Sequence, residues 1–175
     1  FEDVIDLKAY LDTLPPVGSA VLANDLRFPY NIRRGVGLFQ RLYVDGKTFL
    51  PEPEASEAVN RGGYLVLGPG HCTECHSSRN ALGGIIAGEA FAGAESPEGK
   101  GGAPNITPSE DGIGDWSAED IAYFLETGST PDFDVVGESM VLVQENMALL
   151  PPGDREAIAA FLKTLLPRPD PAKTP

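Results

Sequence analysis

The sequence predicts an all-α fold in which loops make up a large share of the chain. Three segments carry apolar residues at helical spacing, and no strand pattern of useful length competes with them. The 175 residues include 20 glycines and 16 prolines. These two types make up about a fifth of the chain, against a usual ~12%, which predicts long turns and few long elements.

The first expected element is a helix over residues 3–14. Its sequence can be laid on residues 154–165 with five identities, and apolar positions also correspond, as Leu7 does with Ile158. Proline follows soon after both segments. A repeated closing helix predicts that residues 1–14 end a preceding domain of the same kind. The alternative is a free-standing amphipathic helix of common composition.

Residues 15–56 are expected to form an interdomain strap, because prolines stand at both ends of the segment. Its middle part differs in charge from the rest of the chain, since residues 27–47 hold five basic residues and Asp45 as the one acidic residue. The basic residues are Arg27, Arg33, Arg34, Arg41 and Lys47. Together with its aromatic side chains, this composition predicts packing on a neighbouring domain or on the acidic part of this one.

The segment 57–67 is expected to be the next helix. It holds Gly62 and Gly63 in its interior, and each costs about 1 kcal/mol relative to alanine at such a position. Because both glycines destabilise the helix, their presence indicates that another part of the backbone approaches closely at this point.

The motif that decides the function class is Cys72-Thr73-Glu74-Cys75-His76, whose C-x-x-C-H spacing is typical of covalent haem c attachment. Two thiols a helical turn apart can each bond one haem vinyl group, and the histidine that follows is delivered to the iron. A redox dithiol needs a βαβ setting, and a zinc site needs four ligands from separate parts of the chain. We therefore expect one covalent haem c rather than a dithiol, a zinc site or two unrelated thiols.

The sixth iron ligand is expected to be a methionine. Both cysteines are consumed, and His71 is tethered on the same side as His76. Met140 follows a turn-like stretch that can project its side chain into a pocket, whereas Met147 lies in an apolar segment where methionine usually fills the core. Met140 is the favoured ligand; an open or water-bound site is the alternative.

Two further helices are expected in the C-terminal half. Ser117 opens the first with a capping-box pattern, and Gly128 follows its end. The second covers residues 153–166, with apolar residues at helical spacing, and stops at Pro167.

The chain is strongly acidic, with 26 acidic against 13 basic residues and a net charge of -13. This sign disfavours binding to nucleic acid or to an anionic membrane surface, and no apolar run approaches the roughly 18 residues of a membrane span. Residues 101–154 include 11 acidic residues and neither lysine nor arginine. A redox partner with a basic docking face fits such a field; the alternative is an acidic surface that only maintains solubility.

These motifs, in this order, resemble the class I c-type cytochromes, and more narrowly the periplasmic cytochrome subunits of bacterial dehydrogenases and the dihaem cytochromes c. The similarity covers residues 57–167 and includes Arg61-Gly62-Gly63-Tyr64-Leu65-Val66, Ser78-Arg79-Asn80 and Ala103-Pro104-Asn105-Ile106-Thr107-Pro108. It implies a class I cytochrome c fold. In that fold the first and last helices cross tightly, which would set Phe161 or Leu162 against the glycines.

The resemblance also implies roles for residues around the haem. Pro104 would offer its backbone carbonyl to the ring of His76. Trp116 resembles a family tryptophan whose indole reaches a haem propionate, and Arg79 is a propionate partner by its charge; the alternatives are a core tryptophan and a solvated arginine. The implied haem-contact residues are Arg79, Pro104, Asn105, Ile106 and Trp116.

The function implied is electron transfer between periplasmic redox partners by a haem c with His76 and Met140 as iron ligands. The implied organisation is a helix ending an upstream haem domain (1–14), a strap (15–56), the haem domain (57–167) and a tail (168–175). No signal peptide precedes Phe1, as expected of a mature or trimmed chain. The alternatives are the electron-relay half of a catalytic dihaem enzyme, of thiosulfate-oxidising or peroxidase type, and a gas-binding or sensor haem.

Overall fold

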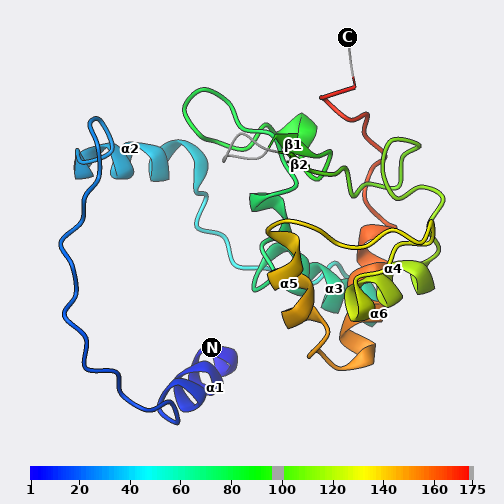
Figure 1. Ribbon diagram of the computed structural model, residues 1–175, viewed down its shortest axis with the longest axis horizontal. Coiled ribbons are helices and arrows are strands. Elements are labelled where there is room, and N and C mark those ends of the chain that lie inside the picture. The colour runs from blue at the N-terminus through cyan, green and yellow to red at the C-terminus, as the bar shows by residue number, and fades with distance from the viewer. Residues whose placement is uncertain (96–100, 174–175) are drawn as a thin grey trace. The chain divides into compact units, whose positions relative to one another are not determined.

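The computed structural model describes residues 1–95 and 101–173 (Figure 1), so the end of the expected tail, residues 174 and 175, lies outside the described part. The helices are α1 (Glu2–Leu11), α2 (Arg33–Tyr43), α3 (Glu57–Leu67), α4 (Ala118–Thr127), α5 (Met140–Met147) and α6 (Pro152–Leu162), with short 3-10 helices η1 (Cys72–Glu74) and η2 (Ala87–Glu89). The strands β1 (Ala94–Glu95) and β2 (Gly102–Ala103) form one antiparallel pair. The predicted all-α class is confirmed.

The chain divides into two compact units, Phe1–Leu38 and Phe39–Pro175. In the first unit, α1 forms where a helix was expected over residues 3–14, but it buries none of its residues. Its apolar side chains are more than half exposed: Val4, Ile5, Leu7, Tyr10 and Leu11. Because most helix stability in proteins comes from packing of an apolar face, α1 lacks its main source of stability within the described residues.

Helix α2 differs from the extended strap that the prolines at both ends of residues 15–56 predict. Val36, Phe39 and Tyr43 recur at helical spacing, which favours the helix. In the second unit, the Tyr43 ring lies 4.9 Å from the Phe39 ring, centroid to centroid, and the Tyr43 hydroxyl accepts from Asn80 Nδ2 at 3.2 Å. The end of the segment thus attaches to the haem-motif unit.

The second unit is built around the contact between α3 and α6. A Cβ placed on Gly62 would overlap the carbonyl oxygen of Ala157, and one placed on Gly63 would lie 3.1 Å from the Phe161 ring. Two glycines one after the other therefore permit the close crossing of these helices. The expected packing of Phe161 on the glycines is confirmed.

A hydrophobic core fills the space between α3, α4, α6 and the loops next to them. Its buried members are Leu65, Val66, Phe91, Ile113, Ile121, Leu125, Ile158, Ala159 and Leu162. Helix α4 begins with the expected capping box of Ser117 and Asp120 and ends at Gly128, which adopts a left-handed conformation.

The last helix, α6, ends at Leu162, four residues before the position expected from the apolar spacing. Thr164 N donates to Phe161 O at 2.9 Å and Leu165 N donates to Leu162 O at 3.2 Å, which are turn bonds rather than α-helical ones. The apolar pattern continues through this turn, so spacing alone did not mark the end of the helix.

Candidate haem site

The haem motif follows α3 in one tight turn. Residues Cys72–Glu74 form η1, and His76 N donates to Cys72 O at 3.0 Å, so the two thiols and the histidine share a single turn. Both cysteines are free thiols. Cys75 is exposed, whereas Cys72 is half-buried against the core, and this burial raises the pKa of its thiol.

The His76 ring is held in one orientation by a backbone carbonyl. The ring is buried, and its Nδ1 lies 2.7 Å from the carbonyl oxygen of Pro104. A carbonyl only accepts hydrogen bonds, so Nδ1 carries the proton and the neutral ring keeps its lone pair on Nε2. Burial lowers the pKa of His76 more than the bond to Pro104 raises it, which also favours the neutral ring. Neutral imidazole is the form that binds a metal.

The loop that contains Gly93 supports His76 from its backbone. Gly93 N donates to His76 O at 3.0 Å. Gly93 has a φ of +98°, and a Cβ there would lie 3.0 Å from Asn105 N and 3.3 Å from Pro104 C. Glycine is required at this position both for its conformation and for the close approach of the Pro104–Asn105 peptide.

Asn105 and Ile106, which follow Pro104, shape this loop through protein contacts. The Asn105 side chain is 2% exposed; its Oδ1 accepts from Thr107 N at 2.8 Å and its Nδ2 donates to Arg168 O at 2.8 Å. Ile106 packs against the core and its N donates to Phe91 O at 2.9 Å. Haem contact by either residue stays a prediction.

Trp116 and Arg79 also have partners within the protein. The Trp116 ring meets the Phe124 ring edge to face at 5.6 Å and packs against the core. Arg79 forms an ion pair with Glu74 at 2.5 Å and donates to Gly83 O at 2.7 Å. Their roles toward haem propionates stay predictions.

The two methionines stand at opposite ends of α5. Met147 packs against the hydrophobic core, whereas the half-buried Met140 is not part of that cluster as described. Gln144, between them, is buried and donates from Nε2 to the carbonyl oxygen of Glu126 at 2.9 Å, which fastens α5 to the end of α4. Met147 thus packs against the core as expected, and ligation by Met140 stays a prediction.

Gly93 and Arg168 build this site but were not expected from the sequence, and Thr107 was expected only as part of the loop motif, without a role. Sequence analysis also missed Lys163, whose Nζ donates to the carbonyl oxygens of Gly114 at 3.0 Å and Trp116 at 2.8 Å. A glycine shortly before the loop that contains Pro104 was the available signal for the first. No nearby residue indicated the roles of Thr107, Lys163 and Arg168, because their contacts join residues about fifty to sixty positions apart in the sequence.

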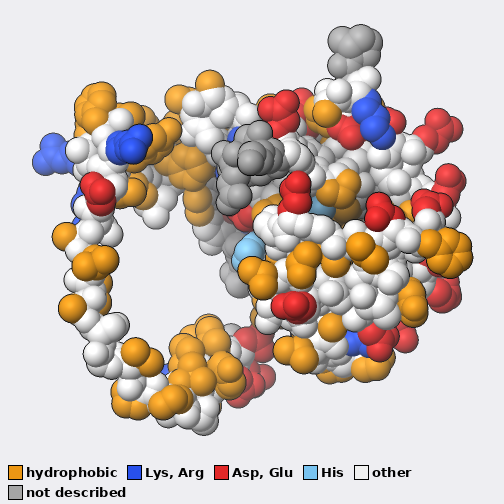
Figure 2. Space-filling model, in the orientation of Figure 1, with side chains coloured by type: hydrophobic (Ala, Val, Ile, Leu, Met, Phe, Trp, Pro, Cys, Tyr) orange, Lys and Arg blue, Asp and Glu red, His pale blue; other side chains and the backbone are white. Residues whose placement is uncertain are grey.

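None of the acidic side chains of residues 101–154 is buried, although the segment also contributes to the core. Figure 2 shows Asp and Glu side chains spread over the visible face of the unit that contains α4 and α6. Arg155, the first basic residue after the segment, is 5% exposed, so its guanidinium sits inside the fold rather than among the surface charges. Among residues 1–95 and 101–173, no helix combines the length and apolarity that a membrane crossing requires.

Comparison with known proteins identifies several relatives, although no protein-family model matches the chain. A protein named diheme cytochrome c-type, from Cereibacter sphaeroides, is 48% identical over 162 residues, which are 93% of this chain and 53% of that protein. The fructose dehydrogenase cytochrome subunit of Gluconobacter japonicus is 34% identical over 94% of this chain and 34% of its own length. The gluconate 2-dehydrogenase cytochrome c subunit of Pantoea cypripedii is 31% identical over 94% of this chain and 39% of its own length.

The chain thus spans about half the length of the first of these relatives and less of the others. All three names describe cytochromes rather than catalytic subunits, and the match to the first extends through the C-x-x-C-H motif, since it leaves out only a few residues of this chain. A turn that offers two thiols and a neutral imidazole, in a helical chain similar over most of its length to proteins named as cytochromes, supports a class I c-type cytochrome.

Proposed function

We propose that this chain transfers electrons through one haem c, bonded to Cys72 and Cys75 and ligated by His76 and Met140. The observation that supports this most is the His76 ring, which is buried directly after two free thiols and donates its Nδ1 proton to Pro104 O at 2.7 Å. This donor set suits haem c, because the thiols are available for thioether bonds and Nε2 is left for the iron. When bound, the haem supplies a reversible one-electron change between ferric and ferrous iron.

The protein residues tune and shield this site. Pro104 fixes the tautomer and orientation of the His76 ring and strengthens it as a donor to the metal. The thioether of Met140 favours ferrous iron and so raises the potential. Apolar core side chains of the same unit, including Phe91 and Ile113, would help to exclude water around the haem.

Removing Met140 tests the ligand assignment. In Met140→Ala we expect loss of the weak far-red absorption that reports sulfur bound to ferric haem, together with carbon monoxide binding to the reduced protein. Met147→Leu is the matched control, because it keeps the volume of a side chain that packs against the core. It should retain both the band and the resistance to carbon monoxide. A far-red band that survives in Met140→Ala, or a high-spin ferric haem in the wild type, would overturn the proposed ligation.

We propose further that α1 closes an upstream haem domain and that residues 15–56 link it to this one. Three observations support the link: residues 3–14 match residues 154–165 at five positions, the apolar side chains of α1 are exposed, and a relative named diheme cytochrome is longer than this chain, which covers 53% of it. That match covers 93% of the chain, so it includes residues 15–56 wherever it begins.

The mass of the native protein tests this organisation. We expect the intact native protein to be heavier than this chain with one haem, by at least one further domain and one further haem. Mass spectrometry of the protein from its source, with a pyridine haemochrome assay for haem per polypeptide, gives both quantities. A native mass equal to this chain plus one haem would refute the upstream domain.

The redox partners are proposed by analogy with the relatives. Cytochrome subunits of dehydrogenases suggest a dehydrogenase as electron donor, in the bacterial periplasm where haem c proteins of this type work. The acidic segment 101–154 suits a docking partner with a basic face, whose association would slow as salt concentration rises.

A further inference from the structure

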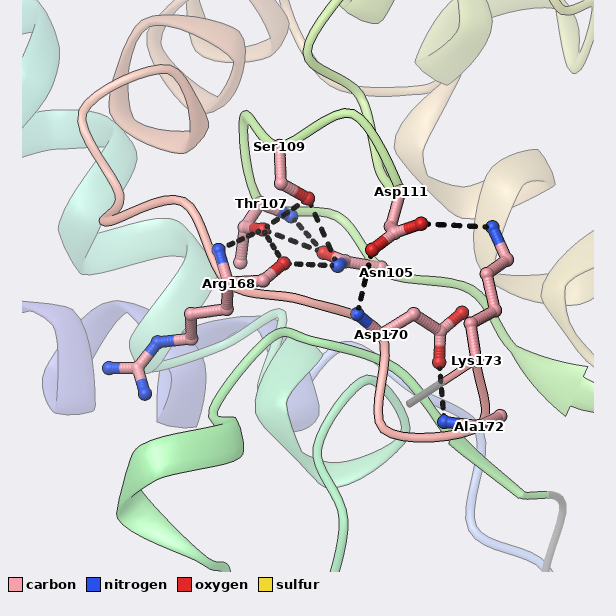
Figure 3. A network of polar contacts seen from close by, with 8 residues as sticks. All are labelled: Asn105, Thr107, Ser109, Asp111, Arg168, Asp170, Ala172 and Lys173. Atoms are coloured by element: carbon pink, nitrogen blue, oxygen red, sulfur yellow. Dashed lines mark hydrogen bonds and ion pairs between the residues drawn. The ribbon is translucent and has the colours of Figure 1, made fainter. Parts of the chain in front are cut away.

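The segment after α6 folds back onto the loop that follows Pro104 (Figure 3). The backbone of Arg168 is inserted between two buried side chains of that loop. Its carbonyl oxygen accepts from Asn105 Nδ2 at 2.8 Å, and its N donates to Thr107 Oγ1 at 3.1 Å. The residues expected as a tail therefore begin with a fixed contact to the haem-site loop.

The side chain of Arg168 reaches a second loop. Its Nη1 donates to the carbonyl oxygen of Ala87 at 2.9 Å and also to that of Gly88, both in η2. One residue thus joins two loops that are separate in the sequence, through its backbone on one side and its guanidinium on the other.

These are the two loops that hold His76. The loop after η2 contains Gly93, which donates to His76 O, and the other contains Pro104, which accepts from the His76 ring. The loops are also bonded to each other, since Ile106 N donates to Phe91 O at 2.9 Å.

The side chains of Asn105 and Thr107 in this connection are buried and paired. Asn105 is 2% exposed and Thr107 is fully buried, and Asn105 Oδ1 accepts from both the N and the Oγ1 of Thr107. A buried hydrogen bond that loses one partner leaves the other unsatisfied, so such a network admits few alternative arrangements. It fixes the Asn105 side chain, and with it the peptide that carries the Pro104 carbonyl.

We propose that Asn105, Thr107 and Arg168 form a clamp that positions the Pro104 carbonyl against His76 and thereby sets the reduction potential of the haem. The three are positioning residues, acting through Pro104. The inference rests on the proposed function, because it takes His76 as the iron ligand. A firm bond from Nδ1 makes the ring a stronger donor and favours ferric iron; a loosened clamp therefore raises the potential.

Two variants open the clamp from different sides. Asn105→Asp keeps the size of the side chain and an oxygen for Thr107, but sets a carboxylate oxygen against Arg168 O where Nδ2 donated. Arg168→Ala keeps the backbone bonds and removes only the guanidinium from η2. Lys173→Ala is the control, because the Lys173–Asp111 pair is long, at 3.7 Å, and exposed.

The readouts are the hydrogen-exchange rate of the His76 Nδ1 proton, followed by NMR on the haem-loaded protein, and the midpoint potential. In both clamp variants we expect about tenfold faster exchange. Each variant also makes the net charge one unit more negative, which by itself lowers the potential, so the potential is compared with that of Lys173→Ala, which changes the charge equally. Relative to that control we expect a rise equivalent to about a threefold higher ferrous-to-ferric ratio. Arg168→Lys should recover part of both changes, and Lys173→Ala should match the wild type in exchange rate. If Asn105→Asp does not fold, Arg168→Ala alone decides.

The outcomes separate the clamp from the proposed function. Variants that melt earlier but keep the wild-type exchange rate and the potential of Lys173→Ala would show a purely structural network and overturn the clamp. A wild type without a low-spin His/Met spectrum would instead overturn the proposed ligation on which the clamp rests.

Discussion

Gly62→Ala is expected to lower the free energy of unfolding of the second unit by about 3 kcal/mol, at the upper end of the usual cost of overpacking. The new Cβ would overlap the carbonyl oxygen of Ala157, which is backbone of α6 and cannot rotate away as a side chain can. The two helices must therefore separate, which loosens the contact around which the unit is built. Urea denaturation followed by far-UV circular dichroism measures the change.

Two other glycines provide graded controls for this experiment. A Cβ on Gly63 would meet only the ring of Phe161, at 3.1 Å, so Gly63→Ala should cost about 1 kcal/mol and be partly rescued by Phe161→Leu. Gly153, in the first turn of α6, has no atom within 4 Å of the position of its Cβ, and Gly153→Ala should leave stability unchanged or raise it by up to about 1 kcal/mol. Equal costs in Gly62→Ala and Gly153→Ala would contradict a close crossing at Gly62.

Arg155→Met is expected to cost about 2–3 kcal/mol, because it removes a buried charged donor from several acceptors. The guanidinium of Arg155 donates to the carbonyl oxygens of Ala148 and Leu150, in the turn between α5 and α6, and pairs with the carboxylate of Glu126 at 3.0 Å. Methionine keeps much of the volume but leaves both carbonyls without this donor. The same denaturation experiment measures the loss.

Glu126→Gln separates the ion pair from the carbonyl bonds. The Glu126 side chain is 56% exposed, so its charge should contribute less than about 1 kcal/mol. We expect Glu126→Gln to unfold nearly as the wild type does, while Arg155→Met unfolds at clearly lower urea concentration. A similar loss in both variants would assign the stabilisation to the ion pair and contradict our account of the carbonyl bonds.

Features that depend on residues close together in the chain could be predicted from the sequence. Helix α3 has the predicted bounds, and α4 begins at the predicted capping box, because caps and apolar spacing act within one or two turns. The fit of Gly62 against α6 was also predictable, since two glycines inside a helix have a cost that only a close neighbour explains. The C-x-x-C-H motif was also recognisable, because its two thiols and its histidine lie within five consecutive residues.

Short elements, and contacts between residues far apart in the sequence, could not be predicted. Strands β1 and β2 have two residues each, too few to show an alternation. Helix α2 contains Gly35 and Gly37, and because glycine is a poor helix former, a helix was not predicted there despite the apolar spacing. The bond between Asn105 and Arg168 joins residues 63 positions apart and depends on a backbone carbonyl, which every residue type has.

The crossing of α3 and α6 also has a consequence for the order in which the chain folds. Gly62 and Ala157 touch across roughly 95 residues of sequence, so closing this contact carries a loop entropy cost that local helices do not have. During synthesis, α3 emerges long before the helix that covers its glycines. Until α6 arrives, the thiol of Cys72 lacks the completed core against which it packs in the finished unit. The turn that carries Cys72, Cys75 and His76 is therefore more accessible in the incomplete chain than in the finished unit.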